Sequence, residues 1–167
     1  KGMIERFLIE HCSATLASIK AANLCNMTFS SKEELEDQIS YWSACLEPKG
    51  IRIFVLREHE TRALVYVYRE GLLQEELENP ENAAFLKSYG YESTDFAYAQ
   101  NRLRNRVAEC KKGFPHEIGV FLDYPLGDVI GFIENHGQNC LCCGIWKVYT
   151  NPEAAAGAFR KFSKCTR

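Results

Sequence analysis

Two apolar segments separated by four residues constrain the fold of this chain more than any other feature of its sequence. Residues 51–57 and 62–69 are dense in Ile, Val, Phe and Tyr, and only residues 58–61 lie between them. This spacing predicts an antiparallel β-hairpin. Because both faces of residues 53–56 are apolar, we expect the hairpin to lie in a sheet that is covered on both sides.

Helical signals surround the hairpin. Apolar residues recur at helical spacing over residues 3–19, and Ser31 with Glu34 forms a capping box for a helix that ends before Pro48. Residues 70–112 are predicted to be wholly helical, and the arginines near their end are expected to lie on solvated helix faces.

Further strands are predicted on either side of these elements. Residues 23–29 are a short strand candidate, and 117–122 and 144–149 are predicted strands that flank a helix over 126–136. Strand, helix and strand over this length indicate a right-handed crossover between parallel strands. A last helix is expected to begin at Pro152.

These elements predict a mixed α+β (α/β) fold in a single domain, residues 1–167. We expect a mixed sheet of about five strands covered by helices, with the β-hairpin, a C-terminal βαβ unit and a helical insertion at about 70–112. A chain of 167 residues, 46% of them hydrophobic, is long enough to bury the core of one such domain.

Composition limits the function classes. The 20 basic and 22 acidic residues are well mixed, which argues against a nucleic-acid partner and against docking on anionic lipid. No run of eighteen apolar residues exists, so no membrane span is expected, and residues 1–12 are too acidic for a secretory signal. We interpret the eight cysteines as reduced thiols of a cytoplasmic protein.

Four blocks of sequence carry a family resemblance. They are residues 11–17 (HCSATLA), 114–125 (FPHEIGVFLDYP), 128–133 (DVIGFI) and 143–149 (CGIWKVY). Together they resemble the bacterial family catalogued as domain of unknown function 3793, over most of the chain. That family tends to have Pro where Ala14 stands and Gly where Ser18 and Asp123 stand. The resemblance implies a small intracellular protein, of a kind found chiefly in anaerobic bacteria, and it implies no mechanism.

Cys12 is the first candidate for chemistry. If the helix breaks after His11 and restarts at Ser13, the thiol would precede a helix N-terminus, whose unpaired N–H groups lower a thiol pKa. His116 would then be the base and Glu117 its orienting partner in a nucleophilic arrangement. The alternative is that Cys12 is a small hydrophobe within an apolar helix stripe.

A Cys-rich segment is the second candidate. It contains His136, Cys140, Cys142 and Cys143, and thiolates together with an imidazole suit Zn or Fe. The spacing differs from the C-x2-C pattern of a zinc knuckle. The alternative is therefore a loop residue followed by the first residue of a buried strand.

A ligand pocket at the carboxyl ends of the predicted parallel strands is the third candidate. We expect Tyr124 and Lys147 to contribute to it, together with His11 and Ser13 from the N-terminal helix. A Lys147 that points into a covered face needs a partner, and Glu117 on the neighbouring predicted strand is the obvious one. An exposed Lys147 would instead protect a sheet edge.

The sequence thus favours a cytoplasmic ligand-, metal- or partner-binding domain with a polar site near His11, Cys12, His116 and Tyr124. Two alternatives stay open: a thiol-dependent enzyme with Cys12 as nucleophile and His116 as base, and a protein-interaction module without chemistry. The G-x-S-x-G and H-E-x-x-H motifs are absent, so no enzyme class is assigned. The expected partner is an unidentified small molecule or protein.

Overall fold

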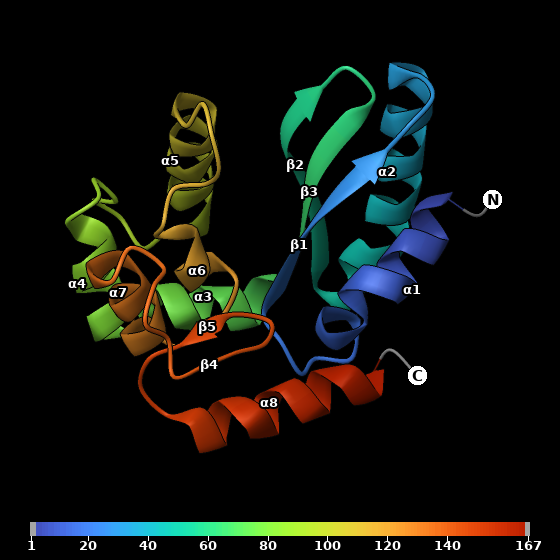
Figure 1. The fold of residues 1–167 in the computed structure, drawn as a ribbon. Helices are drawn as coiled ribbons and strands as arrows, with labels where there is room; N and C mark the ends of the chain where they lie inside the picture. The colour runs from blue at the N-terminus through green and yellow to red at the C-terminus, as the bar shows by residue number, and fades with distance from the viewer. Residues whose placement is uncertain (1–2, 166–167) are drawn as a thin grey trace.

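The computed structural model describes residues 3–165, with the backbone alone at positions 3–5, 7 and 11. At its centre is a three-stranded antiparallel sheet in the order β1-β3-β2 (Figure 1). The strands are β1 (Ala22–Thr28), β2 (Ile51–His59) and β3 (Arg62–Arg69). The hairpin of β2 and β3 confirms the prediction, with a β-bulge between Val55 and Arg57.

Helices cover both faces of this sheet (Figure 1). They are α1 (Met3–Leu16), α2 (Lys32–Leu46), α3 (Glu70–Glu78), α4 (Pro80–Lys87), α5 (Phe96–Glu109), α6 (Ile118–Phe121), α7 (Leu126–Glu134) and α8 (Pro152–Cys165), with a 3-10 turn at Glu47–Lys49 and a small hairpin of β4 (Cys142–Cys143) and β5 (Lys147–Val148). Helices α1 and α2 pack on one face and α5 on the other, while α8 passes beneath the sheet and contacts α1. None of the helices within residues 3–165 combines the length and apolar character that crossing a membrane requires.

Local caps explain where several helices begin and end. Ser31 accepts a hydrogen bond from the Glu34 N–H at 3.2 Å, as the capping box predicts, although the Glu34 carboxylate bonds Ser30 instead of Ser31. Arg69 of β3 closes the end of α1 by donating to the carbonyl of Thr15 at 2.7 Å. This bond fixes the helix end against the central strand.

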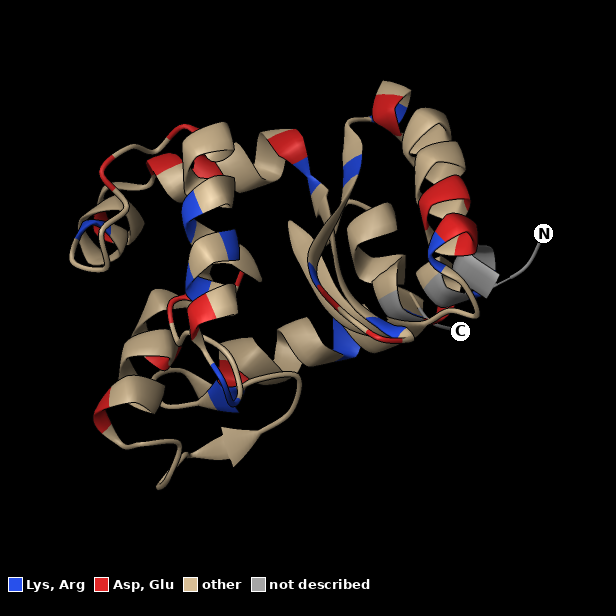
Figure 2. Ribbon diagram, turned by 90° about the horizontal axis from the view of Figure 1, so that it is seen from above, with Lys and Arg blue, Asp and Glu red and all other residues tan. Residues whose placement is uncertain are grey.

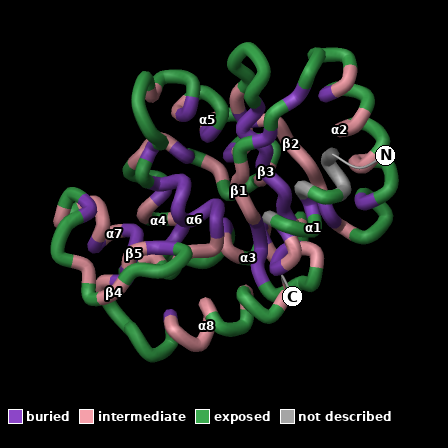
Figure 3. Tube along the Cα trace, turned by 45° about the vertical axis from the view of Figure 1, so that its right-hand side comes forward, coloured by how far each residue is buried: buried purple, intermediate pink, exposed green. Residues whose placement is uncertain are grey.

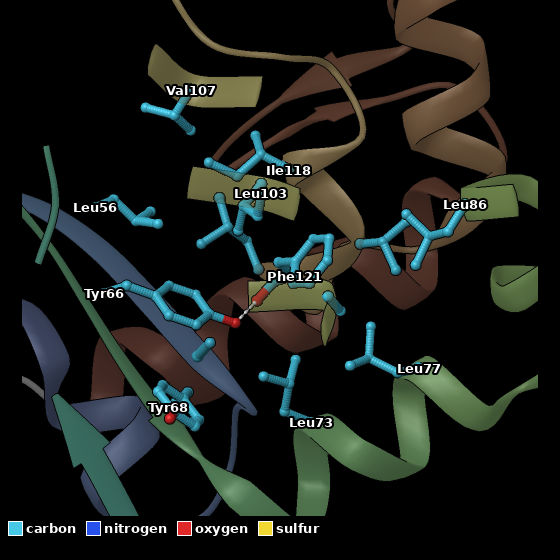
Figure 4. Packing of buried hydrophobic residues seen from close by; sticks show 14 of the residues in the cluster. Leu56, Tyr66, Tyr68, Leu73, Leu77, Leu86, Leu103, Val107, Ile118 and Phe121 are labelled. Carbon is cyan, nitrogen blue, oxygen red and sulfur yellow. Dashed lines mark hydrogen bonds between the residues drawn. The ribbon is translucent and has the colours of Figure 1, made fainter. Parts of the chain in front are cut away.

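Two hydrophobic clusters lie on opposite faces of β3, and a smaller one surrounds Trp146. Val65 and Val67 face α1 and α2, whereas Tyr66 and Tyr68 face α3, α5 and α6. Figure 3 shows that β3 and α6 are buried along their length. The Tyr66 hydroxyl donates to the Phe121 carbonyl at 2.5 Å, which ties α6 to the sheet (Figure 4).

The mixed α+β class is confirmed, but the C-terminal part differs from the prediction. Residues 117–122 contain the buried helical turn α6 and its two caps instead of a strand, and 144–149 contribute only the two residues of β5. Strand β5 pairs antiparallel with β4, so the strands within residues 3–165 form a three-stranded and a two-stranded sheet, and no parallel crossover joins them. A short apolar run predicts burial, but it does not distinguish a strand from a buried helical turn.

Candidate functional site

A cavity of about 570 Å³ lies between α6, α7 and the β4–β5 hairpin. Four aromatic side chains line it, namely Phe114, Tyr124, Phe132 and Trp146. The Tyr124 and Trp146 rings lie 5.1 Å apart between centroids, in a tilted arrangement, and Trp146 is only 7% exposed. Phe114, by contrast, is 38% exposed. The cavity therefore has a rigid aromatic wall and a more accessible aromatic residue.

His116 and Lys147 are among the polar side chains of this lining. The His116 ring lies 5.5 Å from the Phe132 ring, measured between centroids, and His116 is exposed. The Lys147 ammonium donates to the Gly137 carbonyl at 2.6 Å and lies 5.8 Å from the centroid of the Phe132 ring. Of the two alternatives predicted for Lys147, the pair with Glu117 is therefore wrong, because Lys147 bonds a carbonyl beyond the end of α7 and Glu117 pairs with Arg106.

A buried carboxylate holds this part of the fold together. Asp128, 3% exposed, accepts four hydrogen bonds: from the Trp146 indole at 2.8 Å, from the Tyr149 and Thr150 N–H groups at 2.9 and 3.0 Å, and from the Thr150 hydroxyl at 2.8 Å. Asp128 lies in the first turn of α7, where the helix dipole favours negative charge. It therefore joins α7 to β5 and to the residues that follow.

Two glycines make this junction possible. A Cβ at Gly127 would lie 2.6 Å from Thr150 Cγ2, and one at Gly131 would lie 2.5 Å from the Tyr149 side chain. Because these positions are four residues apart, they lie on one face of α7. The absence of a side chain at both positions lets α7 pack closely against Tyr149 and Thr150.

Glu117 has a structural partner instead of the predicted catalytic one. Its side chain is fully buried, and it accepts from Arg106 Nε at 2.7 Å and from the Tyr91 hydroxyl at 3.3 Å. Burial, together with this carboxylate, raises the pKa of Tyr91. Arg106 belongs to the basic residues that mark α5 in Figure 2, which the sequence placed on solvated faces. Glu117 therefore binds α5 and does not orient His116.

Cys12 lies apart from this cavity. Helix α1 runs unbroken through residues 11–13, so no helix N-terminus forms at the thiol. Cys12 is fully buried in the cluster between the sheet, α1 and α2, and a hydrogen bond to Cys25 together with burial raises its pKa. It is absent from the lining of the cavity that contains His116. The structure therefore does not bring the predicted nucleophile to its predicted base.

Ser13 does not line the cavity either. Ser13 lies on α1 beside Cys12 in the chain, and it is partly buried. The side chain of His11 lies outside what the structure describes.

The predicted metal ligands are dispersed. Cys142 and Cys143 are successive residues of β4 and therefore point to opposite faces: Cys142 packs against the cluster around Trp146, whereas Cys143 lines the cavity. His136 is exposed beyond the end of α7. Within residues 3–165, no three His, Cys, Asp or Glu side chains whose placement is described lie close enough together to hold a metal ion.

Of the candidates from sequence, the structure brings together His116, Tyr124, Lys147 and Cys143. Sequence reasoning missed the contributions of Phe132 and Asp128. Both lie in the 128–133 block that carried the family resemblance, so that block held the available signal. The resemblance marks this block as part of the family pattern, but an aromatic and an acidic residue in an amphipathic helix do not by themselves indicate a cavity.

Comparison with known proteins places the chain in a family without assigning an activity. The family model described as "Protein of unknown function (DUF3793)" matches residues 8–167. No curated protein and no solved structure matches the chain.

Proposed function

The chain belongs to this family of unknown function, and we propose that it binds a small, flat, largely apolar molecule that carries an acidic group. The observation that carries the proposal is the cavity of about 570 Å³ whose wall combines four aromatic rings with the Lys147 ammonium. Ligand pockets are typically apolar clefts of ~300–1,000 Å³ with a few placed polar groups, and this cavity agrees in both respects.

The aromatic rings favour a flat ligand. Offset stacking between rings is favourable at centroid separations of ~4.5–7 Å, and the exposed Phe114 leaves one ring able to cover a bound molecule. Trp146 is held by its bond to Asp128 at 2.8 Å, so this wall needs no rearrangement before binding. Preorganisation of this kind reduces the entropic cost of binding.

The cationic side favours an acidic group on the ligand. An ammonium has three N–H donors, and the Gly137 carbonyl takes one Lys147 donor at 2.6 Å. The remaining donors can serve a carboxylate, sulfonate or phosphate. His116, exposed in the same lining, adds a second group that can donate to an anion.

A cytoplasmic location, reduced thiols and a bacterial source belong to the proposal as well. The alternative of thiol catalysis by Cys12 with His116 gains no support, because the two residues lie in different parts of the fold. The competing proposal is a protein-interaction module that binds a protein partner and no small molecule.

The test uses 8-anilinonaphthalene-1-sulfonate, a flat aromatic anion, and follows tryptophan fluorescence in a Trp42→Phe background so that Trp146 reports. We expect one binding site, with affinity reduced about tenfold, equivalent to ~1.4 kcal/mol, by Lys147→Met and by Phe132→Ala. Lys147→Arg should retain most of the affinity. Lys32→Met, on the exposed start of α2, is the matched control.

An uncharged probe, N-phenyl-1-naphthylamine, separates the two parts of the proposal. Its binding should depend on Phe132 and not on Lys147. The proposed site would be contradicted if Phe132→Ala and Lys147→Met left the affinity for both probes unchanged while the circular dichroism of the variants matched the wild type.

A further inference from the structure

A pair of cysteines on the opposite side of the sheet from α5 forms a second chemical centre. The Cys12 sulfur on α1 lies 3.9 Å from the Cys25 sulfur on β1, within reach of a thiol–thiol hydrogen bond. Cys12 is fully buried, whereas Cys25 is partly exposed. Cys25 is therefore the more exposed residue of the pair, and Cys12 is the more deeply buried one.

A buried lysine accompanies the pair. Lys20, in the connection between α1 and β1, is 3% exposed, and its ammonium lies 5.4 Å from the centroid of the Tyr124 ring and 5.8 Å from that of Phe162. Burial lowers the pKa of Lys20, and the Asp123 carboxylate opposes this effect by favouring the charged form. A cation in this position stabilises an anionic sulfur nearby.

The two sulfurs have different roles in this setting. The hydrogen bond between Cys25 and Cys12 lowers the pKa of Cys25, burial opposes the effect, and the Lys20 charge adds to the lowering. The titratable groups that face Cys25 are thus Cys12 from α1, Lys20 from the following connection and Tyr124 from the loop after α6. Cys25 is thus the more readily ionised sulfur of the pair, and Cys12 is the more deeply buried one.

We propose that Cys12 and Cys25 are a redox-active dithiol, in which a peroxide attacks at Cys25 and Cys12 then closes an internal disulfide. The Cys25 thiolate attacks one peroxide oxygen, the O–O bond breaks, and the other oxygen leaves as water after protonation. Cys12 sulfur then displaces the sulfenic oxygen from Cys25, and the proton of Cys12 leaves with that oxygen as a second water. Two thiols and one hydrogen peroxide thus give one disulfide and two waters.

Closing the bond requires a small movement. The two sulfurs must approach from 3.9 Å to about 2.05 Å for the bond to close. Reduction reverses this step: a thiol reductant attacks the disulfide at Cys25, the more exposed residue of the pair.

The experiment treats the folded full chain with one equivalent of hydrogen peroxide, alkylates the remaining thiols and maps the peptides by mass spectrometry. We expect a cross-link between the peptides that contain Cys12 and Cys25, with the loss of two hydrogens and recovery by dithiothreitol. Cys12→Ser should leave a sulfenic acid on Cys25 that dimedone traps. Cys45→Ser, at an exposed thiol on α2, is the matched control and should not change the cross-link.

Lys20→Met tests the role of the cation. This variant should slow peroxide oxidation of Cys25 about tenfold and move the pH profile of its alkylation to higher pH. The proposal is overturned if the exposed Cys45 oxidises in the wild-type chain while Cys12 and Cys25 remain thiols. It is overturned equally if their cross-link forms only after the chain is unfolded.

Discussion

The Trp146 indole N–H donates to the Asp128 carboxylate at 2.8 Å, so an aromatic wall of the cavity is fixed by a side chain from the first turn of α7. The same carboxylate accepts the backbone N–H groups of Tyr149 and Thr150. One buried anion thus sets the position of the indole, of the end of β5 and of α7. The shape of the cavity and the stability of this part of the fold depend on the same group.

Asp128→Asn is expected to lower the free energy of unfolding by about 2–4 kcal/mol, because an amide replaces one acceptor oxygen with a donor and leaves buried N–H or hydroxyl groups unsatisfied. Urea unfolding followed by circular dichroism measures the change. Asp37→Asn, at an exposed position on α2, should stay within about 0.5 kcal/mol of wild type. Equal effects from the two variants would show that the carboxylate network adds no stability.

The buried pair of Arg106 and Glu117 gives a second prediction. Arg106→Met leaves a fully buried carboxylate without its cation and should cost about 3–5 kcal/mol. Adding Glu117→Gln should recover part of this loss, because the double variant buries no uncompensated charge. Lys32→Met removes the exposed pair with Glu36 at 3.9 Å and should cost under about 0.5 kcal/mol. A double variant as unstable as the sum of the two single ones would contradict this account.

The parts of the fold that the sequence predicts are those whose signals are local. The hairpin follows from two strand-like runs with a short gap, and the Ser31 cap lies three residues from its partner. The apolar run at 117–122 has no local signal that separates a strand from a helical turn, and tertiary packing makes it a helical turn.

The candidate site divides in the same way. His116, Tyr124 and Lys147 are recognisable by side-chain chemistry alone. Asp128 is not, because its indole partner lies 18 residues away and its Thr150 partner 22 residues away. The partner of Glu117 is not recognisable either, because no local signal connects it with Arg106 on α5. The separation of Cys12 from His116 is equally hidden, because the sequence does not indicate which face of the sheet each residue occupies.

Ser18 and Asp123 both have a left-handed backbone conformation, but we expect glycine to have opposite effects on stability at the two positions. Ser18 has φ +61° and Asp123 has φ +63°, a conformation that costs a non-glycine residue about 1–2 kcal/mol. Ser18→Gly should raise the free energy of unfolding by up to about 1 kcal/mol, after the greater entropy of glycine in the unfolded chain is subtracted.

Asp123→Gly should instead destabilise the protein. It relieves the same strain but removes the acceptor of the Ala21 N–H at 3.1 Å and the carboxylate beside the buried Lys20. Thermal unfolding of the two variants, side by side at pH 7, measures the difference in sign. Stabilisation by both changes would mean that the Asp123 carboxylate contributes nothing.

Tyr68 predicts how stability falls in alkali. Burial raises its pKa to about 12, above the value of 10.0 expected in an unfolded chain. Its contribution to the free energy of unfolding is therefore fully present below pH 10 and is lost as the pH rises from 10 toward 12. Tyr68→Phe keeps the stacking on Tyr66 and Phe96 and removes the titrating hydroxyl, so this variant should lose about 1 kcal/mol less than wild type between pH 9 and pH 11. Tyr41 is 59% exposed, so Tyr41→Phe should follow the wild-type curve. Urea unfolding across this pH range measures the three stabilities. A parallel loss of stability in all three proteins would contradict the account.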